Sequence, residues 1–106
     1  MCKPVELYNS YNLQINQCIN CKEVNIWRNE ALLKFSTDQF IVFANAIKNI
    51  NFADFSELSA AGEEVLILAT PATDISLIFS QKGWLRFSDG IHQAIYMQNV
   101  YELIHY

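Results

Sequence analysis

An internal repeat is the feature that most constrains the fold of this chain. Residues 32–36 read LLKFS, and residues 84–88 read WLRFS, about half a chain length later in a protein of 106 residues. The match extends upstream without gaps, where VNIWRNEALLKFS aligns with SLIFSQKGWLRFS. Because self-similarity at a fixed period indicates duplicated supersecondary units, we expect residues 11–50 and residues 63–105 to adopt the same structure.

Each half is predicted to contain three strands followed by a helix. Short stretches in which apolar and polar residues alternate, as in half-buried strands, define the strands. The expected strands are residues 11–17, 23–28 and 31–36 in the first half and residues 63–69, 74–80 and 84–88 in the second. Helices are expected at residues 38–50 and 90–105, directly after the N-cap candidates Ser36 and Ser88.

The predicted fold class is α+β. A half of about 50 residues buries too little apolar surface to be stable alone, so residues 1–106 are expected to form a single domain. The two pseudo-symmetric β-β-β-α halves would share one antiparallel-rich sheet of roughly six strands, with both helices on one face. The connector at residues 51–63 carries Phe52, Phe55 and Leu58 and is expected to pack against this domain.

Charge and hydropathy exclude several classes of partner. The chain has 7 Lys and Arg against 11 Asp and Glu and a net charge of −4, without a run of basic residues. This argues against nucleic acids and against anionic membrane surfaces. The apolar stretches FIVFA and VLILA are too short to span a bilayer, and MCKPVELYNS does not resemble a signal peptide. The sequence therefore predicts a cytoplasmic protein with reduced thiols.

Cys18 and Cys21 form a C-x-x-C motif in a segment that is predicted to be a hairpin turn. Two cysteines that flank such a turn can both bind one zinc ion, but a structural zinc site needs two further ligands. His92 and His105 are about 20 Å apart along the predicted helix and cannot share one ion. The candidate metal ligands within one chain are therefore Cys2, Cys18 and Cys21, completed by a histidine or water. Alternatively, two chains could pool their Cys18 and Cys21 pairs into a four-cysteine site across a dimer.

Two other interpretations of the cysteine pair stay open. Thiol–disulfide chemistry favours a C-x-x-C at a helix N-terminus, where the dipole lowers the thiol pKa, whereas the strand EVNIW follows Cys21. The repeat aligns Cys18 and Cys21 with Thr70 and Thr73, so the turn itself does not need thiols. The remaining interpretation is that both are incidental small side chains at a turn.

Surplus apolar surface favours an interaction role over catalysis. The glycines are isolated and no Ser/His/Asp pattern is evident, so we expect neither catalytic residues nor a bound cofactor. Hydrophobic residues make up 52% of the chain and charged residues only 17%, which predicts apolar surface covered by a partner. We expect a homodimer. The interface candidates are Tyr96, Val100, Leu103 and Tyr106, followed by the strand-borne aromatic residues Trp27 and Trp84.

The stretch CINCKEVNIWRNEALLKFSTDQFIVF resembles a family of short, uncharacterised bacterial proteins. In that family a C-x-x-C hairpin leads into a strand and then into an S-x-x-x-F helix start. Cys18 and Cys21 form the pair here, and Ser36 to Phe40 form the helix start. The resemblance covers about a quarter of the chain and implies a bacterial source without implying an activity.

The sequence as a whole favours a small cytosolic binding or interaction module without enzymatic activity. Its partner would be an unknown protein or small molecule. The alternative is a thiol-dependent redox protein or a metal-binding module that uses Cys18 and Cys21.

Overall fold

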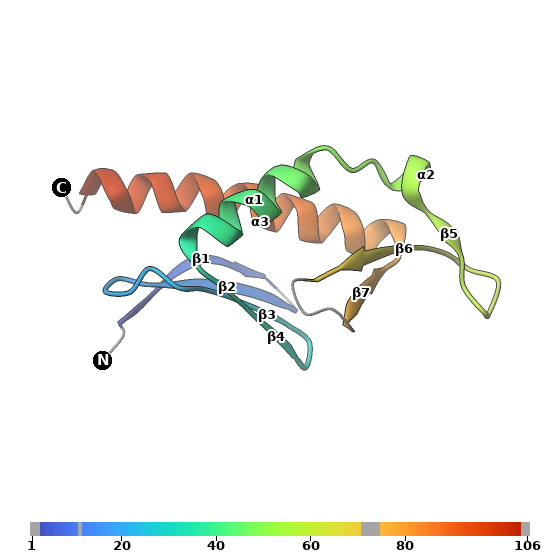
Figure 1. Cartoon of the computed structure of the whole chain (residues 1–106), viewed down its shortest axis with the longest axis horizontal. Coiled ribbons are helices and arrows are strands. Elements are labelled where there is room, and N and C mark those ends of the chain that lie inside the picture. Colours follow the sequence, from blue (N-terminus) through green and yellow to red (C-terminus); the bar gives the residue numbers. More distant parts are fainter. Residues whose placement is uncertain (1–2, 11, 71–74, 105–106) are drawn as a thin grey trace.

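Two antiparallel sheets lie end to end beneath one long helix in the computed structural model (Figure 1). The structure describes residues 3–10, 12–70 and 75–104. The molecule is elongated, with principal dimensions of 49 × 24 × 23 Å. The fold is α+β, as predicted, but the strands are divided between a four-stranded and a three-stranded sheet. The prediction of one six-stranded sheet was therefore wrong.

The first sheet is a meander of four strands in sequence order. Its strands are β1 (Pro4–Ser10), β2 (Leu13–Cys18), β3 (Val24–Arg28) and β4 (Ala31–Phe35). Ile15 and Ile26 face each other in register on the buried face, and Trp27 and Leu32 form an exposed pair on the other face. The strands β2, β3 and β4 lie where the alternating pattern predicted them, and β1 was not predicted.

Helix α1 (Thr37–Lys48) follows the first sheet directly and begins at the predicted cap. The Ser36 hydroxyl accepts a hydrogen bond from the Gln39 backbone N–H at 3.2 Å, and the Gln39 side chain accepts one from the Ser36 N–H at 3.0 Å. This reciprocal capping box satisfies two N–H groups that the helix itself leaves unpaired. The buried residues Phe40, Ala44 and Ile47 form one stripe along α1.

The second sheet contains three short strands that follow the connector. A single helical turn, α2 (Phe52–Phe55), buries Phe52 and leads into β5 (Glu57–Leu58). Strand β5 pairs with β6 (Glu64–Ala69), and β6 pairs with β7 (Ser76–Phe79). The connector therefore packs against the molecule through Phe52, whereas Phe55 and Leu58 are exposed.

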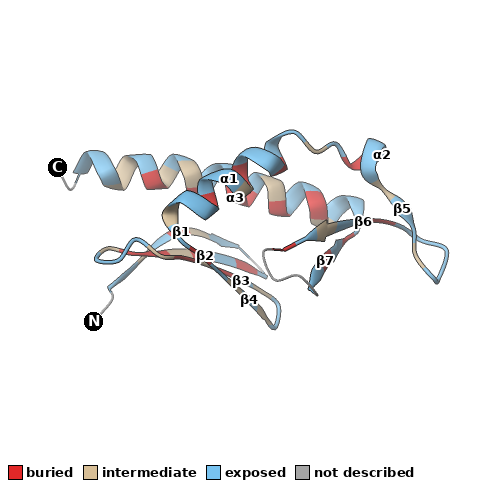
Figure 2. Cartoon of the chain, viewed as in Figure 1, coloured by how far each residue is buried: buried red, intermediate tan, exposed pale blue. Residues whose placement is uncertain are grey.

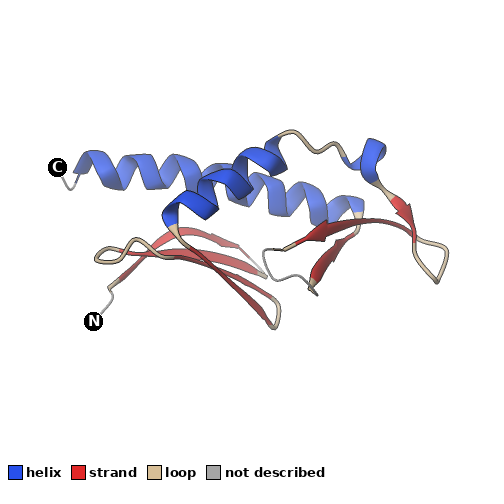
Figure 3. Cartoon of the chain, in the orientation of Figure 1, coloured by secondary structure: helices blue, strands red, loops and turns tan. Residues whose placement is uncertain are grey.

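Helix α3 (Gln81–Ile104) contains the second copy of the sequence repeat, which was predicted to be a strand (Figure 3). LLKFS lies in β4 and WLRFS lies in α3, so the predicted pseudo-twofold relation between residues 11–50 and 63–105 was wrong. Ser80 directly precedes the helix and caps it, because its hydroxyl accepts a hydrogen bond from the Gly83 N–H at 3.1 Å. Ser88, the predicted cap, lies in the interior of α3 and its hydroxyl donates to the Leu85 carbonyl at 3.2 Å.

One continuous hydrophobic core joins both sheets through α3 (Figure 2). The helix packs against β1 and β2 of the first sheet, against β6 and β7 of the second, and against α1. A series of aromatic contacts crosses the molecule: the Phe35 and Phe43 ring centroids are 4.8 Å apart, those of Phe43 and Phe87 are 6.3 Å apart, and those of Phe87 and Phe79 are 4.8 Å apart. The wide apolar surface of α3 therefore covers two sheets instead of one.

Candidate functional site

The cysteine pair lies at the β2–β3 turn, as predicted. Cys18 is the last residue of β2 and is buried, whereas Cys21 is exposed in the turn. The Cys21 backbone N–H donates to the Cys18 sulfur at 3.4 Å. Within the described part of the chain, no group of three or more His, Cys, Asp or Glu residues is placed to hold a metal ion. Because Cys2 lies outside the described residues, the predicted site of Cys2, Cys18 and Cys21 stays a prediction.

The predicted interface residues are scattered over the molecule. Tyr96 and Leu103 on α3 are 67% and 81% exposed, and Val100 between them is half-buried. Trp27 is exposed on the outer face of the first sheet. Trp84 lies in α3, not on a strand, and is only 2% exposed against Phe79, so its assignment to a surface was wrong. Tyr106 lies outside the described residues.

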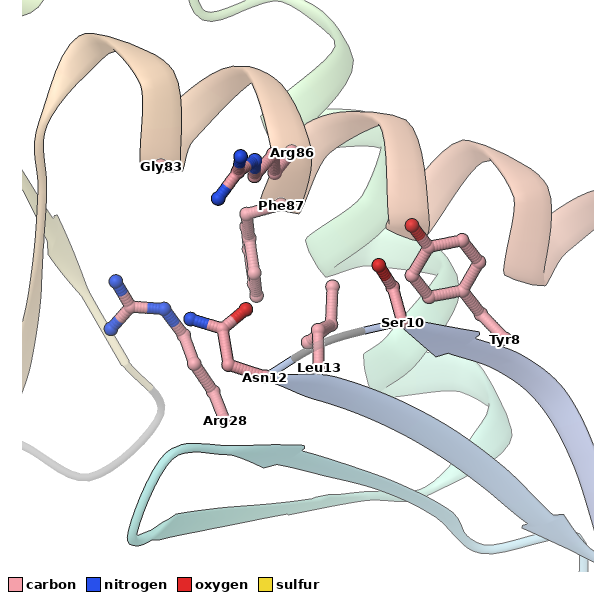
Figure 4. Close-up of a pocket in the computed structure, with 8 residues that line it drawn as sticks. All are labelled: Tyr8, Ser10, Asn12, Leu13, Arg28, Gly83, Arg86 and Phe87. Carbon is pink, nitrogen blue, oxygen red and sulfur yellow. The ribbon is translucent and has the colours of Figure 1, made fainter.

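A cleft of about 460 Å³ opens where the two sheets meet beneath the first turns of α3 (Figure 4). One side of the cleft is formed by strand β1, by Asn12, by the start of β2 and by the end of β3. Helix α3 forms the other side. The residues that line it are Tyr8, Ser10, Asn12, Leu13, Arg28, Gly83, Arg86 and Phe87. The cleft therefore combines side chains that are far apart in the sequence.

Arg28, the last residue of β3, connects the cleft to the second sheet. Its guanidinium carbon lies 4.3 Å from the centroid of the Phe79 ring, and its Nη2 donates to the Ile78 carbonyl at 3.3 Å. Burial lowers the pKa of Arg28 from its ordinary value, but arginine remains protonated at neutral pH. These contacts fix the guanidinium beside the cleft and leave other N–H donors available.

Arg86 reaches the same cleft from α3, one turn after Gly83 (Figure 4). Its side chain is exposed. Neither Arg86 nor Arg28 forms an ion pair with a carboxylate in the described part of the chain, and no described Asp or Glu lines the cleft. Two cations thus share a cleft without an acidic partner among the described residues, in a chain whose acidic residues outnumber its basic ones.

A β-bulge positions Tyr8 in this cleft. The register between β1 and β2 shifts between Glu6 and Tyr8, which inserts one additional residue. A bulge of this kind redirects the side chains that follow it, and Tyr8 packs against α3 at Gly90. A Cβ atom at Gly90 would lie 2.9 Å from Cε2 of Tyr8 and 2.6 Å from Cδ2 of Leu13. The absence of a side chain at Gly90 therefore allows α3 to approach the cleft-forming ends of β1 and β2.

The described lining provides hydrogen-bond donors and positive charge. The guanidinium groups donate only, and Ser10, Asn12 and Tyr8 can donate through hydroxyl or amide groups. Carboxylates, thiols and imidazoles, the usual proton-transfer groups, are not among the described lining residues. The described lining thus presents hydrogen-bond donors and two positive charges to the cleft.

Sequence reasoning missed this site for an identifiable reason. Arg28 and Arg86 are separated by more than half of the chain, so no local motif connects them. The repeat alignment also matched Arg86 with Lys34 of the first half and placed it on a strand. Only the helical assignment of residues 81–104 brings Arg86 to the end of β3.

Comparison of the chain with protein-family models, with curated proteins and with solved structures finds no match. The resemblance of residues 18–43 to a family of short bacterial proteins therefore stays a prediction. No helix in the described ranges has both the length and the apolar character needed to cross a membrane.

Proposed function

We propose that this chain is a small, non-enzymatic cytosolic binding module that holds a small anionic molecule in the cleft between Arg28 and Arg86. The observation that carries the proposal is that two guanidinium groups without a described carboxylate partner line the same cleft. Arg28 is half-buried, and a cation that is partly removed from water without a counter-charge is unfavourable; Arg86 is exposed and adds a second positive charge at the same cleft. A bound anion would supply that counter-charge.

The size and chemistry of the cleft support this proposal. A volume of about 460 Å³ is within the range that small-molecule sites occupy. The planar guanidinium group donates parallel hydrogen bonds to carboxylates and phosphates. Arg28 is held in place by Phe79 and Ile78 before any ligand arrives, so binding need not order this side chain.

Calorimetric titration with citrate and with inorganic phosphate tests the proposal. We expect saturable binding of at least one probe that weakens by about tenfold or more in Arg86→Gln. The matched control is Lys34→Gln, which removes one positive charge from the exposed face of β4, outside the cleft, and should change affinity by about twofold or less. Equal losses in both variants, or no binding of either probe at millimolar concentration, would contradict an anion site in this cleft.

A second candidate function is self-association, which the exposed C-terminal turns of α3 favour. Tyr96, Leu103 and Ile104 are large apolar side chains that the described chain leaves uncovered. A twofold dimer would bury them, as the apolar composition predicts. Light scattering should return twice the chain mass of 12.2 kDa, and Leu103→Lys should shift the protein to monomer. A monomer in the unmodified protein at micromolar concentration would rule this candidate out.

A further inference from the structure

We infer that the anion held between Arg28 and Arg86 is an organic dicarboxylate. The inference rests on the proposed function and names the ligand class for that cleft. Charge, the direction from which each arginine enters, and the state of the backbone donors at the start of α3 each support it.

The charge of the cleft matches a dianion. Arg28 and Arg86 are both protonated at any physiological pH, and no described lining residue carries a negative charge. A monocarboxylate would compensate only one of these cations. A ligand with two carboxylates compensates both, and each carboxylate can accept paired hydrogen bonds from one guanidinium.

The two arginines enter from opposite walls of the cleft. Arg28 projects from the end of β3 and Arg86 projects from α3 (Figure 4). The aromatic ring of Phe87 and the side chain of Leu13 lie in the same lining. Two separate cations with an apolar wall beside them suit two carboxylates joined by a methylene spacer better than one compact anion.

The backbone at the start of α3 argues against inorganic phosphate. Phosphate sites at helix N-termini use the unpaired N–H groups of the first turn. In α3 the Gly83 N–H donates to the Ser80 hydroxyl at 3.1 Å, and the Trp84 N–H donates to the Ser80 carbonyl at 2.8 Å. Gly83 is the residue of this turn that lines the cleft, and its backbone donor is already engaged. The remaining donors of the described lining are side chains, so this turn does not offer the backbone cradle that favours phosphate over a carboxylate.

Matched ligand pairs test the inference. Calorimetry at low ionic strength would compare each dicarboxylate from malonate to adipate with the monocarboxylate of the same chain length that ends in a methyl group. Inorganic phosphate serves as a compact anion of similar charge. We expect at least one dicarboxylate to bind about tenfold or more tightly than its matched monocarboxylate and than phosphate. The advantage should vary with spacer length, because Arg28 is held in place by Phe79 and Ile78 and the second carboxylate must extend from it to Arg86.

Variants assign the difference to the arginine pair. In Arg86→Gln the preference for the dicarboxylate over its matched monocarboxylate should largely disappear, because one guanidinium remains. In Lys34→Gln the preference should persist. Arg86→Lys retains the charge but lacks the planar fork, and we expect it to recover only part of the preference. Circular dichroism spectra would establish that each variant is folded.

The outcomes separate the ligand class from the underlying anion site. If phosphate or a monocarboxylate binds as tightly as the best dicarboxylate and depends on Arg86, the anion site stands and the dicarboxylate assignment is overturned. If no carboxylate and no phosphate binds at millimolar concentration, both are overturned. A preference for dicarboxylates that is unchanged in Arg86→Gln would also overturn the assignment.

Discussion

At the scale of single residues, Gly90 shows how one position sets the distance between α3 and the first sheet. A Cβ atom there would lie 2.6 Å from Leu13 Cδ2, closer than real carbon contacts allow. Overpacking costs about 1–3 kcal/mol, and the helix propensity of alanine offsets about 1 kcal/mol of it, so we expect Gly90→Ala to lower the free energy of unfolding by up to about 2 kcal/mol. Urea denaturation measures the change.

Gly83→Ala provides the matched control for Gly90→Ala. It lies in the same helix, and its added Cβ would meet only the rotatable Ser80 hydroxyl, at 3.2 Å. We expect its free energy of unfolding to remain within about 1 kcal/mol of the unmodified protein. If both alanine variants were equally stable, close approach at Gly90 would not be the constraint that the structure indicates.

Gln98 is a second informative residue because its side chain is buried on α3, where it is 4% exposed. Its Nε2 makes no hydrogen bond to the residues that the structure describes. A buried donor without an acceptor costs about 1–3 kcal/mol.

We expect Gln98→Met to raise the free energy of unfolding by about 1 kcal/mol, measured by urea denaturation. Gln93→Met on the exposed face of α3 should change it by about 0.5 kcal/mol or less, and a large loss in Gln98→Met would show that the amide is paired in solution.

At the scale of elements, the structure differs from the sequence-based expectation most clearly at the start of α3. The helix begins at Gln81, whereas the repeat predicted a start at residue 90. Ser80 caps the helix through the Gly83 N–H, and Ser88 lies within it. We expect Ser80→Ala to lower the free energy of unfolding by about 1 kcal/mol. Ser88→Ala should be neutral or slightly stabilising, because a serine inside a helix competes for the backbone carbonyl of the preceding turn. Thermal denaturation of both variants tests this, and the reverse order would support the helix start at residue 90 that the repeat predicted.

The elements that the sequence predicted correctly are those with local signals. Helix α1 has a capping box at Ser36 and Gln39 and a regular apolar stripe, and β2 and β3 alternate clearly. Residues 84–88 are ambiguous, because Leu85 and Phe87 alternate like a strand whereas the buried residues of α3 follow helical spacing. Those buried residues are Trp84, Phe87, Gly90, Ile91, Ala94 and Gln98. Gly83 and Gly90 both lie inside α3, and a well-packed helix tolerates both.

At the scale of the whole molecule, Arg28 has a position that no sequence pattern could indicate. It lies at the end of the first sheet, and its partners, Phe79 and the Ile78 carbonyl, belong to the second. The two sheets share a core beneath α3, and Arg28 adds a polar and cation–π contact between them at the cleft. The Arg28 side chain therefore has two roles: it stabilises the arrangement of the two sheets and it lines the candidate anion site. Arg86 only lines the site.

This difference predicts that the two arginines respond differently to substitution. Arg28→Met should lower the free energy of unfolding by about 1–2 kcal/mol, because it removes both the stacking on Phe79 and the hydrogen bond to Ile78. Arg86→Met should change it by about 0.5 kcal/mol or less, because Arg86 is exposed and unpaired within the described chain.

Both variants should bind the anion weakly, and added ligand should raise the melting temperature only of proteins that retain both arginines. Thermal denaturation with and without ligand measures all of these effects. Equal stability losses in the two variants would contradict a bridging role for Arg28, and ligand stabilisation that persists in Arg86→Met would place the anion elsewhere on the molecule.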